Sequence, residues 1–127
     1  MTQKRKKLGK KGEDIAVNFL KKNKYRILFR NYTCVFGEID IIAQHKKILS
    51  FIEVKTRSSK VYGPPQEAIP PAKQKKITRV AMEFIQRHRL EDRAARFDVV
   101  AVQFSSDGCQ VDLIQDAFEL EAGVMER

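Results

Sequence analysis

Apolar residues recur at helical spacing in two segments of the chain, and five shorter segments are apolar or alternate in the manner of strands. Ala16, Val17 and Leu20 form a stripe that predicts a helix over residues 8–23. A second stripe predicts a helix over residues 71–90, which begins at a proline, a residue that favours a helix start. The shorter segments predict strands at 25–32, 37–43, 48–55, 96–104 and 109–115. This order of elements predicts an α/β domain in which helices flank a small mixed β-sheet.

The domain organisation follows from length and from where the polar segments lie. A chain of 127 residues with 43% hydrophobic content suits a single domain over residues 1–127. Residues 56–71 contain all four prolines and predict a long irregular connection. Residues 1–7 are expected to form a mobile basic arm, and residues 116–127 a loosely ordered acidic tail.

Three ionisable residues interrupt the apolar runs of the second and third strands, namely Asp40, Glu53 and Lys55. If these strands form a hairpin that turns at Lys46-Lys47, Asp40 lies opposite Glu53, with Cβ atoms roughly 5 Å apart. Glu53 and Lys55 share one strand face because side chains alternate along a strand. Burial of an ionised group costs on the order of several kcal/mol of folding free energy unless the group is paired or binds a cation. The pattern therefore predicts a divalent metal site.

Other ionisable residues allow both a structural and a functional interpretation. Glu13 lies on the apolar stripe of the first helix, where the free amides and dipole of a helix start could stabilise it, or it could join the metal site. Asp98 lies inside a predicted strand, and we expect it to pair with a nearby arginine or with loop amides. His45 and His88 have no partner at ligand spacing and are interpreted as structural or exposed.

The charge distribution predicts a polyanionic partner. Lysine and arginine number 25 against 16 aspartates and glutamates, which gives a net charge of +9. The basic excess lies in residues 1–30 and 55–96, on both sides of the carboxylate-bearing strands. Such segments bind phosphate backbones by releasing condensed counterions, although a solvated basic surface is the alternative interpretation.

The two cysteines and the hydropathy pattern bear on the compartment. Cys34 and Cys109 have neither a CxxC spacing nor a neighbouring histidine pair, so we expect reduced thiols and no zinc site. No uncharged apolar run approaches the roughly 20 residues of a membrane span. We therefore expect a cytoplasmic protein without a membrane segment.

Four short motifs together resemble the YraN family of small bacterial proteins, within the PD-(D/E)xK nuclease superfamily of restriction endonucleases and archaeal Holliday junction resolvases. The motifs are GKKGEDIA at 9–16, GEIDIIA at 37–43, FIEVKTR at 51–57 and QKKI at 74–77. Ile39 stands where the superfamily name expects proline. The resemblance covers about residues 9–104 and implies a restriction-endonuclease-like three-layer α/β domain with a small mixed central sheet.

The resemblance also implies a role for each motif residue. Asp40 and Glu53 would bind Mg²⁺ or Mn²⁺ through carboxylate oxygens, and the Val54 carbonyl and waters would complete the shell. Glu13 would supply a further carboxylate, either behind these ligands or to a second metal. Lys55 would orient the attacking water and stabilise charge on the phosphate, while the metal lowers the pKa of that water.

The second helix is expected to contribute to the same site and to substrate binding. Gln74 matches a polar position that many relatives of this fold direct at the site, and we count it with the catalytic residues. The partner implied is nucleic acid, DNA rather than RNA, and resolvases of this fold act as homodimers. Six basic residues are expected to contact nucleic acid: Lys10, Lys11, Arg57, Lys73, Lys75 and Lys76.

Two functions of different classes follow from these residues. The first is a metal-dependent endonuclease-like phosphodiesterase acting on branched or damaged DNA. The second is a non-catalytic nucleic-acid-binding module of a DNA-processing complex, which retains the nuclease fold and its metal residues. A variant of the second is a purely architectural nucleic-acid binder, in which the acidic residues form salt bridges with Lys55 and Arg57. The carboxylates favour the first, because binding a polyanion gains nothing from carboxylates at the centre of a basic surface.

Overall fold

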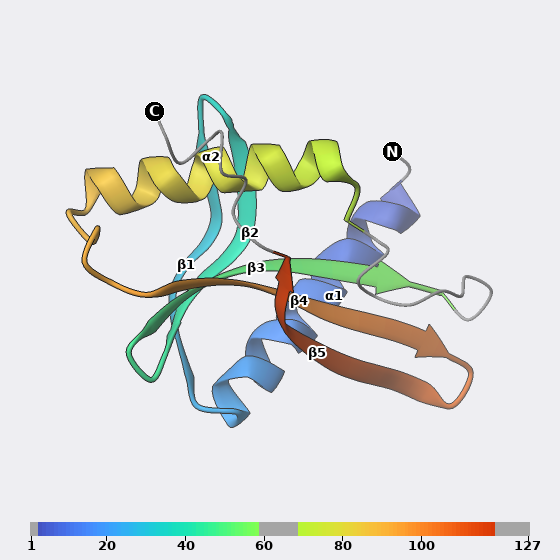
Figure 1. Cartoon of the computed structure of the whole chain (residues 1–127). Coiled ribbons are helices and arrows are strands. Elements are labelled where there is room, and N and C mark those ends of the chain that lie inside the picture. The colour runs from blue at the N-terminus through green and yellow to red at the C-terminus, as the bar shows by residue number, and fades with distance from the viewer. Residues whose placement is uncertain (1–2, 59–68, 119–127) are drawn as a thin grey trace.

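The computed structural model describes residues 3–58 and 69–118, which form three layers (Figure 1). Five strands make one mixed sheet in sequence order, with β3 parallel to β4 and every other neighbouring pair antiparallel. One helix covers each face of the sheet, which confirms the predicted α/β fold class. The elements are α1 (Gln3–Lys22), β1 (Tyr25–Cys34), β2 (Gly37–His45), β3 (Ile48–Arg57), α2 (Pro71–Arg87), β4 (Ala95–Ser105) and β5 (Gly108–Phe118).

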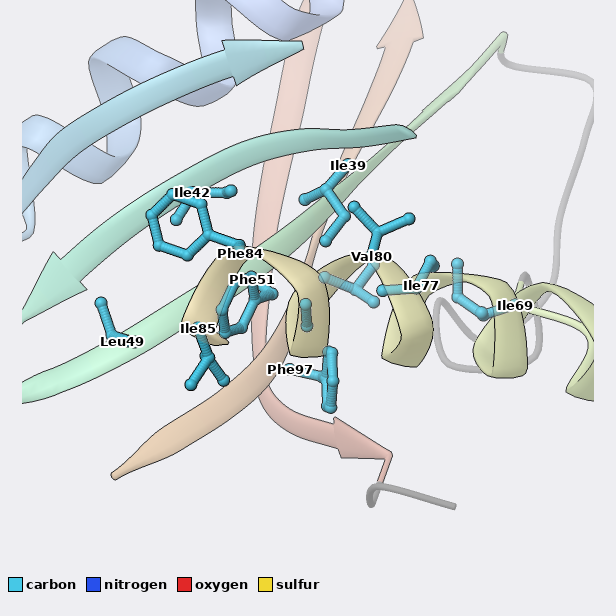
Figure 2. Close-up of a cluster of buried hydrophobic side chains, with 12 residues drawn as sticks. Ile39, Ile42, Leu49, Phe51, Ile69, Ile77, Val80, Phe84, Ile85 and Phe97 are labelled. Atoms are coloured by element: carbon cyan, nitrogen blue, oxygen red, sulfur yellow. The ribbon is translucent and has the colours of Figure 1, made fainter. Parts of the chain in front are cut away.

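Apolar side chains on the central strands alternate between the two faces of the sheet, so each helix packs on an apolar face. Phe51 of β3 points to α2, where its ring meets that of Phe84 with 5.9 Å between centroids (Figure 2). The next residue, Ile52, points to the other face and packs with Ile41 and with Leu20 of α1. Both helices are therefore held by buried apolar surface, which is the main favourable term in folding.

Element boundaries differ from the predicted ones at both ends of the chain. Helix α1 begins at Gln3, so residues 3–7 of the expected arm are helical, and the lysines and leucine that follow are good helix formers. Strand β5 continues through residues 116–118 of the expected tail, because the Asp116 amide donates a hydrogen bond to Asp98. The rest of that arm and tail, and residues 59–68 of the irregular connection, lie outside the described residues.

Helix α2 begins at Pro71, as predicted, and ends at Arg87, before the predicted end at Leu90. Arg89 has a φ of 56°, a left-handed conformation that a helix cannot continue through. Neither described helix is long and apolar enough to span a membrane.

The buried carboxylate of Asp98, which is 1% exposed, forms hydrogen bonds with groups from four strands. It accepts from the Tyr25 hydroxyl at 3.2 Å, the Ser50 hydroxyl at 2.5 Å and the Arg96 Nε at 2.8 Å. It also accepts from the Asp116 amide at 2.9 Å. We call these five residues the Asp98 network. The predicted pairing of Asp98 with a nearby arginine is confirmed, whereas the amide that donates to it belongs to strand β5 and not to a loop.

Replacement of Asp98 by alanine should strongly destabilise the domain. Arg96 would stay largely buried without its counter-charge, and breaking one partner of such a pair lowers the free energy of unfolding by about 3–5 kcal/mol. Urea denaturation measures this change. The control Asp92→Ala removes an exposed carboxylate and should change stability by less than about 0.5 kcal/mol. Equal effects of the two substitutions would contradict the role of the network.

Candidate functional site

The hairpin of β2 and β3 has the predicted register, and its paired ladder ends just before the predicted site. Ile41 lies opposite Ile52, and the pairing continues in step to the turn at Lys46-Lys47. Beyond Ile41 and Ile52 the two strands separate. The first residues of β2 come from the β1–β2 turn, whereas β3 continues alongside β4 (Figure 1). Asp40 is the first residue past the end of this ladder.

The side chain of Asp40 continues the contact between the strands where the backbone ladder has stopped. Its Oδ2 accepts a hydrogen bond of 2.8 Å from the Val54 amide on β3. This bond holds the Asp40 carboxylate next to Glu53, the residue before Val54. We call Asp40 and Glu53 the acidic pair, and the structure brings them together as the sequence predicted.

Glu53 is 4% exposed, and its ion-pair partner is a lysine from another element. Lys73 Nζ, in the first turn of α2, lies 2.7 Å from Glu53 Oε2. Lys55, the expected neighbour on the same strand face, makes no ion pair within 4 Å in the described part of the chain. The sequence predicts only a nucleic-acid contact for Lys73, because spacing along one strand cannot reveal a partner from a distant helix.

Burial and crowded charge shift the pKa values at the acidic pair. Burial, reinforced by the charge of Glu53, raises the pKa of Asp40 to about 7. Glu38, two residues away on β2, raises the Asp40 pKa further. Burial, followed by the charge of Lys73, lowers the pKa of Lys55. Burial also opposes the charge on Lys73, but its hydrogen bond to Glu53 outweighs this and the Lys73 pKa is raised.

Glu13 of α1 belongs to the same electrostatic cluster. Burial raises the pKa of Glu13, and the charge of Asp40 raises it further. The Arg30 guanidinium lies 3.6 Å from the Glu13 carboxylate and partly offsets these effects. Because α1 begins at Gln3, Glu13 is far from the free amides of the helix start, and that interpretation of Glu13 was wrong.

A close approach between α1 and β3 places Glu13 near Asp40. A Cβ atom at Gly12 would overlap the Thr56 hydroxyl, so only glycine lets the helix pack this closely against the end of β3. The signal in the sequence is the glycine directly before the glutamate. Its meaning depends on tertiary contact, because glycine inside a helix is otherwise unfavourable.

Gln74 and the basic residues lie in the surrounding elements. The Gln74 amide donates a hydrogen bond of 2.9 Å to the Ile69 carbonyl, so this side chain fixes the segment that leads into α2. The ammonium of Lys11 lies 5.4 Å from the centre of the Phe104 ring. The other residues assigned to nucleic acid are exposed on the helices or half-buried at the end of β3: Lys10, Lys75, Lys76 and Arg57.

The acidic pair offers the oxygen ligands that a hard divalent cation prefers. Carboxylate and backbone carbonyl oxygens are the ligands that Mg²⁺ and Mn²⁺ prefer. The raised pKa of Asp40 indicates a carboxylate with too little compensating charge, which a cation would supply. Residues 3–58 and 69–118 contain no group of three or more His, Cys, Asp or Glu side chains arranged to hold a metal ion. A cation at this place would have two side-chain carboxylates of the described residues as ligands, those of Asp40 and Glu53.

The structure is a three-layer α/β domain with a five-stranded mixed sheet and one helix on each face, consistent with a restriction-endonuclease-like fold, and the acidic pair lies where β2 and β3 part. The chain belongs to the uncharacterised protein family UPF0102, whose sequence model matches residues 12–102. This membership confirms the resemblance to the YraN family.

Relatives of the same family cover nearly the whole chain. A UPF0102 protein of Syntrophus aciditrophicus is 50% identical over 115 residues, 91% of each chain. One from Geobacter metallireducens is 47% identical over 91% of this chain and 94% of its own. Another, from Syntrophotalea carbinolica, is 43% identical over 95% of this chain and 98% of its own.

Asp40→Asn should stabilise the metal-free protein at alkaline pH. The Asp40 pKa is about 7 in the folded state against 3.8 for an unperturbed group, so the folded state binds more protons between these values. Wild-type stability therefore falls as the pH rises through this range. Asparagine avoids the loss and can still accept from the Val54 amide. In EDTA the variant should melt several degrees above wild type at about pH 8, with a smaller difference near pH 4.

Melting curves across this pH range measure the effect, and Asp107→Asn in the exposed β4–β5 turn is the matched control. The control should follow the wild-type pH dependence throughout. A pH dependence of Asp40→Asn parallel to that of wild type would show that Asp40 titrates in its ordinary range.

Proposed function

We propose that this protein is a metal-dependent phosphodiesterase that cleaves nucleic acid, DNA rather than RNA. The acidic pair with Lys55 beside it carries the proposal. Buried carboxylates weaken the binding of a polyanion, whereas hydrolysis of a phosphodiester with a divalent cation requires them. Membership of UPF0102 is compatible with this activity but does not specify it.

Each residue of the site has a distinct role in this proposal. Asp40, Glu53 and the Val54 carbonyl would hold Mg²⁺ or Mn²⁺, and the bound cation would lower the pKa of a water and offset charge on the phosphate. Lys55 would hold the attacking water and donate to a phosphate oxygen. Its lowered pKa supports this role, because it reflects an ammonium that is partly stripped of water. Glu13 would position Asp40 and add negative charge behind it.

The basic residues around the site would bind the phosphate backbone. Lys75 and Lys76 are exposed on α2, the helix whose first turn reaches Glu53 through Lys73. Lys10 and Lys11 lie on α1 just before Gly12, which packs against β3. Contacts from both helices would place a backbone across the acidic pair without reading base sequence.

A non-catalytic nucleic-acid-binding module is the second candidate. The Lys73–Glu53 ion pair favours it, because an ammonium already compensates one carboxylate of the acidic pair. In such a module Lys55 and Lys73 would serve only to neutralise the carboxylates, and metal ions would have no effect on nucleic acid.

Lys55→Ala should abolish cleavage while the protein stays folded and retains Mn²⁺ and DNA binding. Loss of a group that acts on the water and the transition state should lower kcat by about 10²-fold or more. The assay uses branched, flapped, single-stranded and duplex DNA in Mn²⁺, Mg²⁺ and EDTA. Lys47→Ala, in the exposed β2–β3 turn, is the control and should cleave like wild type. Wild type that cuts none of these substrates in Mn²⁺ would favour the binding module.

DNA affinity should fall steeply with salt and depend little on sequence. The double substitution Lys75→Ala/Lys76→Ala should flatten the slope of log affinity against log salt by about 1–2, because each phosphate contact contributes roughly 0.9. Fluorescence anisotropy at several salt concentrations measures the slope. Lys21→Ala/Lys22→Ala, at the C-terminal end of α1, removes the same amount of charge and should change the slope less. A slope near zero in wild type would exclude a polyanionic partner.

A further inference from the structure

The acidic pair is bridged to a helix by a lysine whose position is otherwise unfavourable. Lys73 is the third residue of α2, and the first turn of this helix contains no acidic residue. A cation in the first turn is opposed by the positive end of the helix dipole. An attraction of Lys73 to Glu53 at 2.7 Å compensates for this repulsion.

The contact joins an accessible cation to a buried anion. The Lys73 side chain is 44% exposed, whereas the Glu53 side chain is 5% exposed. Lys73 can therefore swing into solvent without leaving a buried ammonium behind, but Glu53 cannot follow it. Glu53 and Asp40 would then lie side by side without a compensating charge, and burial and mutual repulsion already raise the pKa of Asp40.

Lys55 does not take this role although it is closer along the chain. It lies two residues from Glu53 on the same strand, yet within the described residues it makes no ion pair under 4 Å. The ammonium that compensates Glu53 comes instead from α2, an element that can move its side chain independently of β3. A divalent cation and Lys73 Nζ cannot both occupy the space beside Glu53 Oε2.

We propose that Lys73 is an internal substitute for the metal ion, which neutralises the acidic pair in the metal-free protein and is displaced from Glu53 when a divalent cation binds. This exchange rests on the proposed function, since it concerns the regulation of the same site. It makes metal binding a competition between a divalent cation and a tethered ammonium. Lys73 therefore sets the metal concentration at which the site fills.

Mn²⁺ titration calorimetry and melting in EDTA on the full chain test the exchange in wild type, Lys73→Ala, Lys73→Gln and Lys75→Ala. Removal of the competitor should lower the Mn²⁺ dissociation constant of both Lys73 variants by about fivefold, the upper value for loss of one ion pair that involves an exposed lysine. Lys75→Ala removes an exposed charge from the same helix and should shift the constant by less than about twofold. Lys73→Gln retains a hydrogen-bond donor near Glu53, which guards against loss of folding.

Melting temperatures give a readout that does not depend on activity. In EDTA both Lys73 variants should melt below wild type, and saturating Mn²⁺ should raise their melting temperatures more than that of wild type. Unchanged Mn²⁺ affinity in both variants would overturn the exchange and leave the proposed function standing. Mn²⁺ binding by the variants but not by wild type would support the substitution and refute metal-dependent cleavage. Absence of Mn²⁺ binding from all of them would refute both.

Discussion

The sheet depends on satisfying one buried charge, the carboxylate of Asp98. Its hydrogen bonds reach the first, third and fifth strands as well as Arg96 on its own strand, so these strands cannot shift register without leaving an anion unpaired. Ile52, next to Glu53, is the backbone partner of Asp98 across the parallel β3–β4 pair. The network therefore fixes β3 firmly on one side. On its other side the ladder to β2 ends at this same residue, which leaves Asp40 and Glu53 beyond it.

Because β2 and β3 separate at the acidic pair, side chains from both helices can reach it. Glu13 approaches Asp40 from α1, and Lys73 approaches Glu53 from α2, although the helices cover opposite faces of the sheet. Side chains from opposite layers can meet only where the sheet no longer separates them. Gly12 allows the approach from α1, since any side chain there would overlap Thr56.

Most of the fold and the acidic pair could be predicted because they depend on local rules. A short turn fixes hairpin register, and register alone places Asp40 near Glu53. The partner of Glu53 could not be predicted, because the distance between Lys73 and Glu53 depends on how α2 packs on the sheet. The same limit applies to β5, which is extended by a contact to Asp98 from a segment whose own composition resembled a tail.

The parallel pairing of β3 with β4 requires a crossover, and two parts of the chain that belong to it, the end of β3 and the first turn of α2, lie beside the acidic pair. Lys55 lies near the end of β3, and Lys73 lies in the first turn of α2, so both of these elements carry a lysine to the site. Connections between elements tolerate changes in length better than the elements themselves. Because β2, β3 and α2 supply Asp40, Glu53, Lys55 and Lys73, these four groups depend on regular structure and not on the length of the connection.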